Sequence, residues 1–254
     1  MKKSFLILIV LFVLSFLYAE IDSVYKARIQ QKIAELEFDG MLSLWITDCD
    51  TGKPIQSATV DISNIGAFKT DSNGIASFPT LADGIYDFTI NHNEYVSTNE
   101  KFEVFGESIF FYKYSVPKKV DYKCIKIILD WGQTPKDLDA HLIKENFYHI
   151  SFRDKIKSND KKVWLDRDDM NSFGPETITI TELDKNSTYK YFVFNWTDRN
   201  NSKNLSLSKS GAKVRIYVEN KFLHTFKISD SKQGIKWNVF NIEHGKFVPV
   251  NEIE

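Results

Sequence analysis

The chain has 254 residues, enough for two small domains, and its composition, 43% hydrophobic and 14% aromatic, is that of a folded protein. The formal net charge is −1, with 33 basic residues interspersed among 34 acidic ones, which excludes the basic surface of a general nucleic-acid-binding protein. The 20 Phe and 11 Tyr favour β structure over a helical bundle.

The chain begins with a leader-like segment. A basic Met-Lys-Lys start precedes an apolar run at residues 5–17. This arrangement is typical of a secretory signal peptide, and the run is short for a membrane span. We predict a signal peptide at residues 1–19 with cleavage after Ala19, and therefore a secreted or periplasmic protein. If the leader is not cleaved, it is the part of the chain that contacts a membrane.

A short helix or stalk is predicted at residues 20–39. Ile29, Ile33 and Leu36 recur at helical spacing with charged residues between them, and Asp22 stands where a helix cap is expected. We assign this segment no activity of its own.

Residues 40–116 show short alternating runs separated by turn signals, the pattern of an antiparallel β-sandwich. Examples of the alternation are Leu42, Leu44 and Ile46, and Ala58, Val60 and Ile62. The Asp-Ser-Asn-Gly sequence at residues 71–74 predicts a hairpin turn rather than a calcium loop, since Asn-Gly is the strongest short hairpin signal.

The order of these signals resembles the carboxypeptidase regulatory-like (transthyretin-like) domain. The residues that carry the resemblance are Asp50, Gly52, Pro54, Ala58 and Val60, then Thr70, Asp71, Asn73, Gly74, Ala76 and Phe78, then Leu81, Gly84 and Tyr86. The resemblance implies a non-catalytic module that spaces, stabilises or binds.

After a short polar linker, residues 117–254 predict a second antiparallel sandwich or jelly-roll-like domain, because neither βαβ alternation nor a long helical period is present. The fold class is therefore all-β, with two tandem antiparallel β-sandwich domains after a signal peptide and a short N-terminal helix. A polar turn is expected at 158–162. The expected strands are 124–131, 137–143, 149–152, 163–165, 176–180, 189–196, 212–218, 221–228 and 237–242.

This second half resembles the YfaP-like (DUF2135) family of secreted proteins of unknown function. The matching blocks are Leu129, Trp131, Gly132, Pro135, Asp137, Leu138, Asp139, His141 and Leu142, then Leu165, Asp166, Asp168 and Asp169, then Gly174, Pro175, Glu176, Thr177 and Ile178. The family brings no established activity, so any function must be argued from the residues.

Acidic residues at every second position of an extended segment lie on one face of it. Asp137 and Asp139, with His141 next in line, are therefore expected along one edge of the domain, and Asp166 and Asp168 along another. If the fold brings the two edges together, the carboxylates repel one another unless a cation, an arginine or bound protons offset the charge.

Clustered carboxylates without cysteine ligands favour a hard cation such as Ca²⁺. We predict a Ca²⁺ site formed by four aspartates, and three further residues are additional candidates. The four are Asp137, Asp139, Asp166 and Asp168, and the additional ones are Asp169, Glu176 and His141.

Three alternatives remain open from the sequence. In the first, the acidic residues cap turns, pair with Arg153 or Arg167, and bind nothing. In the second, a transition metal binds to His141 and His149. In the third, paired carboxylates belong to a secreted, glycan-directed hydrolase. No nucleophile elbow, P-loop or zinc-protease motif supports catalysis.

The expected function is that of an exported, non-catalytic binding or cell-envelope interaction protein whose partner is a protein or a glycan. Trp131, Trp164 and Trp196 are the aromatic residues that would stack on a glycan if they are exposed. The alternatives are the hydrolase and a purely structural spacer. Cys49 and Cys124 form an inter-domain disulfide or remain two buried thiols.

Overall fold

The computed structural model describes residues 22–155, 162–229 and 231–254. Within these ranges the chain forms seventeen strands in four sheets, together with one N-terminal α-helix and one short 3-10 helix. The prediction of an all-β sandwich fold is confirmed. The predicted leader at residues 1–19 and most of the predicted polar turn at 158–162 lie outside the described residues.

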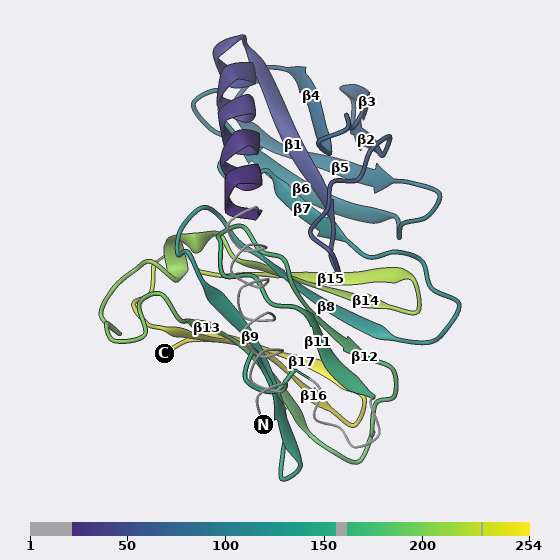
Figure 1. The fold of residues 1–254 in the computed structure, drawn as a ribbon, viewed down its shortest axis with the longest axis vertical. Helices are drawn as coiled ribbons and strands as arrows, with labels where there is room; N and C mark the ends of the chain where they lie inside the picture. The colour runs from purple at the N-terminus through teal and green to yellow at the C-terminus, as the bar shows by residue number, and fades with distance from the viewer. Residues whose placement is uncertain (1–21, 156–161, 230) are drawn as a thin grey trace, which may run out of the picture.

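The first half of the molecule is a sandwich of a three-stranded and a four-stranded sheet (Figure 1). The strand orders are β4-β1-β7 and β3-β2-β5-β6, and β1 pairs with β7 in parallel while the other strands of these sheets pair antiparallel. The strands are β1 (Met41–Asp48), β2 (Thr59–Ile62), β3 (Gly66–Lys69), β4 (Ile75–Pro79), β5 (Gly84–Asn91), β6 (Thr98–Val104) and β7 (Lys113–Val116).

The Asp-Ser-Asn-Gly turn does not close a hairpin, contrary to the sequence prediction. It joins β3 to β4, and these two strands belong to different sheets. The Asp71 carboxylate accepts hydrogen bonds from the backbone N–H groups of Asn73 (2.8 Å) and Ile75 (3.0 Å), and Gly74 adopts a φ of +76°. The local turn chemistry was predicted correctly, but local chemistry does not decide which sheet the next strand joins.

The predicted N-terminal helix is present at residues 22–38 and lies along β1 (Figure 1). Its apolar stripe is buried, because Ile29 and Ile33 pack against Trp45 and Ile75 of the three-stranded sheet. Among the described residues, no helix has the length and apolar character needed to span a membrane.

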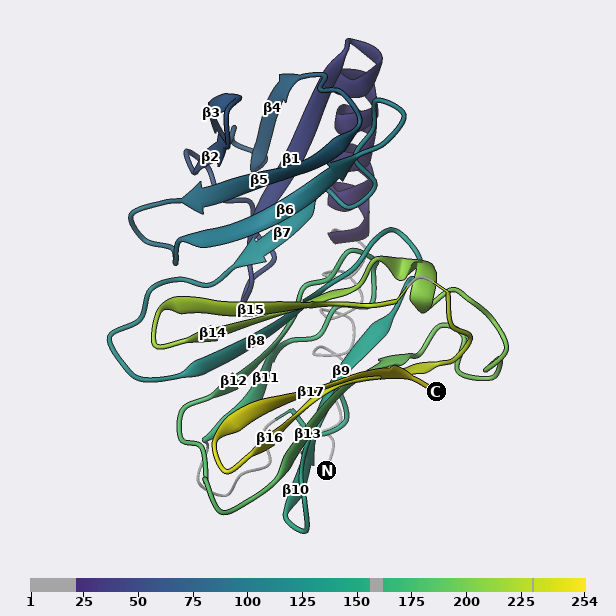
Figure 2. The ribbon, with the colours of Figure 1, turned by 180° about the vertical axis from the view of Figure 1, so that it is seen from behind.

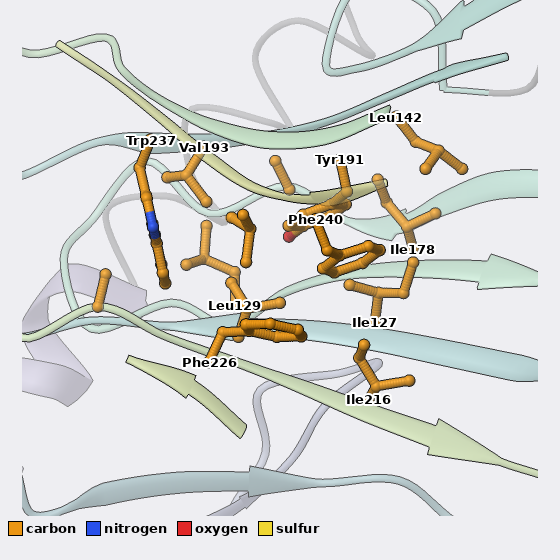
Figure 3. Close-up of a cluster of buried hydrophobic side chains, with 14 of the residues drawn as sticks. Ile127, Leu129, Leu142, Ile178, Tyr191, Val193, Ile216, Phe226, Trp237 and Phe240 are labelled. Carbon is orange, nitrogen blue, oxygen red and sulfur yellow. The ribbon is translucent and has the colours of Figure 1, made fainter. Parts of the chain in front are cut away.

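The second half is a sandwich of two five-stranded antiparallel sheets with strand orders β10-β9-β13-β16-β17 and β11-β12-β8-β14-β15. Apolar side chains from both inner faces form its core (Figure 3). The strands are β8 (Ile125–Asp130), β9 (Leu138–Lys144), β10 (Tyr148–Ile150), β11 (Val163–Arg167), β12 (Glu176–Ile180), β13 (Tyr189–Asn195), β14 (Lys213–Val218), β15 (Lys221–Lys227), β16 (Lys236–Glu243) and β17 (Lys246–Ile253), with the 3-10 helix η1 (Ser208–Ser210) before β14.

Buried charges join the two halves. The outer face of β8 and β14 meets β6 and β7 of the first sandwich (Figure 2), where the Arg215 guanidinium contacts Asp130 (2.6 Å) and Glu100 (3.0 Å). Asp130 also accepts a hydrogen bond from the backbone N–H of Ser115 at 2.9 Å. The interface is therefore held by polar contacts between the halves as well as by apolar packing.

The two cysteines do not form an inter-domain disulfide: Cys49 and Cys124 are both buried free thiols.

Candidate metal centre

The candidate site lies where β9 and β12 begin, one strand from each sheet of the second sandwich. Trp131 connects the turns that precede these strands: its indole N–H donates to the Pro135 carbonyl at 2.9 Å, and its ring packs on Gly174. A Cβ at Gly174 would lie 2.7 Å from that ring, and the residue has a φ of +69°, so glycine is required there. The turn chemistry around Trp131 thus places the first residues of both strands close together.

Three carboxylates converge at this point. Ligand atoms of Asp137, Asp139 and Glu176 all lie within 4.8 Å of one another. Glu176 faces inward from β12, and its two carboxylate oxygens accept hydrogen bonds from the backbone N–H groups of Ala140 (2.6 Å) and Asp169 (3.2 Å). Asp139 is 3% exposed and Glu176 1% exposed, so the cluster is largely shielded from solvent.

The electrostatics of the cluster are unfavourable for charged carboxylates. Burial, together with the charge of Asp168, raises the pKa of Asp137 to about 6. Burial, together with the charges of Asp137 and Asp168, raises the pKa of Asp139 to about 8, and burial raises the pKa of Glu176 well above its usual range. The charges of Lys136, Arg153 and Arg199 lower the pKa values of the two aspartates by less than burial and like charge raise them, so protons or a bound cation must neutralise the rest.

Two oxygen atoms in the cluster have unused acceptor capacity. Asp137 Oδ1 and Asp139 Oδ2 are buried, and neither has a hydrogen-bond partner among the described residues. A buried acceptor without a partner costs about 1–3 kcal/mol, and more when it is charged. Oxygen atoms of this kind, gathered from carboxylates, are the ligands that a hard divalent cation prefers.

Asp168 lies at the margin of the cluster. Its charge raises the pKa values of Asp137, Asp139 and Glu176. Its ion-pair partner is the Lys155 ammonium at 2.8 Å, on a side chain that is half exposed. Three of the four predicted aspartates are therefore neighbours in the structure, with Glu176 as the fourth acidic member.

The structure does not bring Asp166 into the cluster, which corrects the prediction for that residue. The Asp166 carboxylate accepts hydrogen bonds from the Thr179 hydroxyl (2.6 Å) and the Trp164 indole N–H (2.7 Å), and it pairs with Lys126 at 3.4 Å. The register of β11 against β12 shifts between Leu165 and Arg167, and the strand ends there. Strict alternation therefore fails between Asp166 and Asp168, and their side chains take different surroundings.

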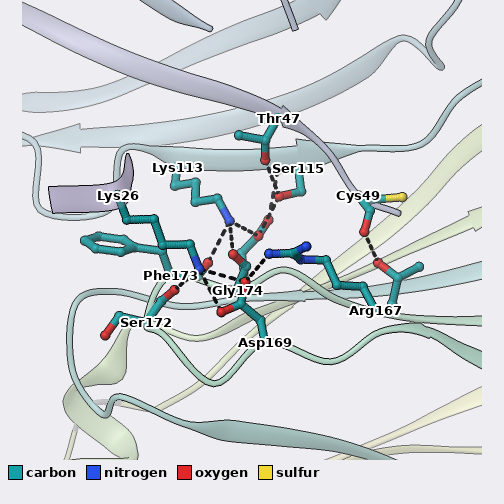
Figure 4. A network of polar contacts seen from close by, with 12 residues as sticks. Lys26, Thr47, Cys49, Lys113, Ser115, Arg167, Asp169, Ser172, Phe173 and Gly174 are labelled. Carbon is teal, nitrogen blue, oxygen red and sulfur yellow. Dashed lines mark hydrogen bonds and ion pairs between the residues drawn. The ribbon is translucent and has the colours of Figure 1, made fainter. Parts of the chain in front are cut away.

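Asp169 and His141 also have other partners. The Lys26 ammonium of the N-terminal helix lies 2.7 Å from both Asp169 oxygens, and Arg167 contacts the same carboxylate at 2.7 Å (Figure 4). His141 Nδ1 lies 2.8 Å from His149 Nε2, and its ring stacks on Phe192. Burial lowers the pKa of His141 to about 3, which keeps the ring neutral.

A patch of aromatic and arginine side chains flanks the cluster, and we name it the aromatic–arginine patch: Phe152, Arg153, Trp196 and Arg199. Phe152 and Trp196 meet edge to face at 5.1 Å, and both arginines lie over the Trp196 ring. The two aromatic side chains are partly exposed and the two arginines are exposed. Of the three tryptophans singled out in the sequence, Trp196 belongs to this surface, whereas Trp131 is buried.

From the sequence, Glu176 was only an additional ligand candidate and Arg153 only an ion-pair partner of the acidic residues, and Arg199 was not predicted. The signal for Glu176 was present, because a Gly-Pro turn directly before an alternating strand fixes where that strand begins. Arg153 follows β10 and Arg199 follows β13, and the two residues come together because both strands pair with β9. Local sequence pattern does not show which strands pair.

Comparison with known proteins identifies no family. No family model and no curated protein matches the chain. One solved structure, described as "a putative carbohydrate binding protein" from Bacteroides uniformis, matches with a TM-score of 0.27 and 11% sequence identity, covering 74% of this chain and 98% of that chain. A likeness this small establishes neither a family nor a function for this chain.

Proposed function

We propose that this protein is an exported, non-catalytic binding protein whose second sandwich holds one Ca²⁺ ion at Asp137, Asp139 and Glu176, with Asp168 at the margin. The observation that carries the proposal is the convergence of three carboxylates within 4.8 Å, two of which have buried oxygens without a hydrogen-bond partner among the described residues. A Ca²⁺ ion takes six to eight oxygens in a flexible shell, so backbone carbonyls and water would complete the coordination.

The proposed partner is a glycan that binds beside the cation, on the aromatic–arginine patch. Partly exposed aromatic rings such as Trp196 stack on the apolar faces of sugars, and arginine N–H groups donate to hydroxyl or carboxylate groups. The charges of Arg153 and Arg199 already act on Asp139 and Asp137, so cation binding would change the potential over the patch. Export is supported by the leader-like sequence at residues 1–19.

The first test is a thermal melt of the purified protein in EGTA and in millimolar Ca²⁺, with Mg²⁺ as a second cation. Binding to the folded state at a hundredfold excess over Kd adds about 2.7 kcal/mol, which raises Tm by roughly 5–10 °C for a protein of this size. Asp139→Asn should abolish the shift, whereas Asp61→Asn, an exposed aspartate of the first sandwich, should leave it intact. The absence of a shift in the unsubstituted protein would refute the Ca²⁺ site.

A second experiment tests the partner. The protein is applied to an array of glycans in Ca²⁺ and in EGTA, and Trp196→Ala is compared with Trp164→Ala, a partly buried tryptophan outside the patch. Glycan binding that requires both Ca²⁺ and Trp196 is the expected result. Glycan binding that persists in EGTA or in Trp196→Ala would show that the cation site and the glycan site are not linked as proposed. If a protein partner instead binds with a requirement for both Ca²⁺ and Trp196, that protein and not a glycan is the partner.

A hydrolase is the second candidate, because the pKa of Asp139 near 8 beside that of Asp137 near 6 provides a proton donor and a base. Two observations favour the cation. Glycosidase carboxyl groups lie roughly 5–10 Å apart across an open cleft, whereas these lie within 4.8 Å, and Asp139 and Glu176 are nearly inaccessible to a substrate. Hydrolysis of a glycan in EGTA that is lost in Asp139→Asn would reverse this preference.

A further inference from the structure

A cleft separate from the acidic cluster lies between the two sandwiches. Its volume is about 390 Å³, within the range of small-molecule sites, which favour interfaces between domains. One wall comes from β5, β6 and the segment 105–111 of the first sandwich, and the other from η1 and the facing ends of β14 and β15. Nothing in the proposed cation binding uses this cleft.

The walls of the cleft are apolar although solvent reaches them. Ile85, Phe105 and Phe110 line it and are 68%, 66% and 70% exposed, and Phe111 lines it as well. Large exposed apolar side chains that gather in one place mark interaction sites in soluble proteins. Burial of their exposed area against a ligand is therefore the favourable contribution that this cleft offers.

The Phe111 side chain is fixed in place by glycines. Its ring packs on Gly211, which ends η1 with a φ of +63°, and a Cβ at that position would overlap the ring. Gly132 packs on the same ring, with 3.1 Å between its would-be Cβ and the nearest ring carbon. This part of the wall is thus preformed, and binding would not need to order Phe111 first.

The rim of the cleft is cationic. Four lysines line it against one glutamate, and Lys209 and Lys227 are exposed. The buried Lys213 ammonium donates a hydrogen bond to the Tyr114 hydroxyl at 3.1 Å, and the exposed Lys101 pairs with Asp87 at 2.8 Å. An anionic group that enters the cleft therefore meets complementary charge at its edge.

We propose that this cleft binds a small amphiphile with an apolar body and a single anionic head group, the chemistry of a medium-chain fatty acid. The apolar body packs between Phe110, Phe111 and Ile85, and the head group lies at the lysine rim. The aromatic wall lies beside the ammonium groups of Lys209 and Lys227, which have no ion-pair partner among the described residues. This juxtaposition distinguishes the ligand class from neutral or cationic amphiphiles.

The test measures displacement of anilinonaphthalene sulfonate from the intact protein by three ligands with the same chain: decanoate, decanol and decyltrimethylammonium. Decanoate should displace the dye at the lowest concentration, and the cationic ligand should be the weakest. Equal potency of decanoate and decyltrimethylammonium would overturn the proposal.

Matched variants locate the binding. Phe110→Ser should weaken decanoate at least about tenfold, because it removes an apolar wall. Phe147→Ser is the control, since Phe147 is also 70% exposed but lies in the turn between β9 and β10. Lys227→Gln should weaken decanoate without weakening decanol, whereas Lys221→Gln at the other end of β15 should change neither.

Two outcomes count against the proposal. If Phe110→Ser and Phe147→Ser behave alike, the dye and decanoate bind elsewhere. The second outcome combines three results: the protein self-associates, Phe110→Ser disperses the dimer, and decanoate does not bind to the dispersed, folded protein. The cleft is then an interface between copies of this chain.

Discussion

Two groups of buried carboxylates lie in this molecule, and the protein compensates their charges differently. In the inter-domain network, Glu100 and Asp130 face Arg215. In the same network Asp169 faces Lys26 and Arg167, as Figure 4 shows. In the candidate metal centre, Asp137, Asp139 and Glu176 face mainly one another. The residue types are the same, but only the first group forms ion pairs with buried or partly buried cations of the chain. The arginines near Asp137 and Asp139 are exposed and offset burial and like charge only in part.

The pKa directions follow this difference. For Glu100 and Asp169 burial raises the pKa, but the nearby cations outweigh burial and the net pKa is lowered. For Asp137, Asp139 and Glu176 burial and like charge act in the same direction, and the pKa values are raised. Buried carboxylates alone therefore do not indicate a metal site; what indicates one is the lack of an internal cation.

The largest expected effect comes from breaking the compensated group. Arg215→Met should lower the free energy of unfolding by about 3–5 kcal/mol, because buried Glu100 loses its ion-pair partner and buried Asp130 keeps only Lys113 at 3.4 Å. Denaturant unfolding with a fixed m value measures the change. Lys123→Met is the control: Lys123 and Glu219 are both exposed, so the expected change is within about 0.5 kcal/mol. Equal effects of the two substitutions would remove the basis of the comparison.

The uncompensated group should respond to pH in the opposite sense to a salt-bridged carboxylate. An unfolded aspartate titrates near pH 4, whereas Asp139 in the folded protein titrates near 8. Between these values the folded state holds a proton that the unfolded state has released, so the metal-free protein should lose stability as pH rises from about 4 towards 8. A protein whose Tm in EGTA rises over this range would contradict the assignment.

The same titration predicts how Ca²⁺ binding depends on pH. Ca²⁺ binds the deprotonated carboxylates, so binding must release protons from the cluster. The increase in Tm on adding Ca²⁺ should therefore be larger at about pH 8 than at about pH 5.5, and calorimetry in buffers of different ionisation enthalpy should detect proton release. Asp139→Asn should remove both the pH dependence of the Ca²⁺-induced increase in Tm and the proton release on Ca²⁺ binding.

Much of the fold follows from short-range pattern, but not all of it. Asp139 and His141 were predicted to share one face of an extended segment, and Leu138, Ala140 and Leu142 on the other face of β9 belong to the core. The last strand, Lys246–Ile253, was not predicted, because it is mostly exposed and contains Pro249, features that are tolerated in an edge strand and weaken the strand signal. This edge strand therefore lacks the apolar alternation on which the prediction depended, although the edge strands β10, β11 and β15 were predicted.

The candidate site was predicted in part for a related reason. Asp137 and Asp139 precede and begin a regular strand, so their placement follows from local pattern. Whether an aspartate has an internal cation depends on distant residues: Lys26 is separated from Asp169 by 143 positions, and Lys126 from Asp166 by 40. No local pattern in the sequence contains that information, and a bulge such as the one in β11 changes it further.

The smallest expected effect is also the sharpest test of where the cation binds. Asp166 and Asp168 are two residues apart, yet Asp166 pairs with Lys126 and Asp168 adjoins Glu176. Asp168→Asn should reduce the Ca²⁺-induced increase in Tm, because it removes negative charge beside the cluster. Asp166→Asn should leave that increase unchanged and lower stability by about 1 kcal/mol, since Lys126 keeps Asp50 as a partner. Melts of both variants with and without Ca²⁺ give the comparison. If Asp166→Asn abolishes the Ca²⁺ response and Asp168→Asn does not, the cation binds at the inter-domain edge of β11 rather than between β9 and β12.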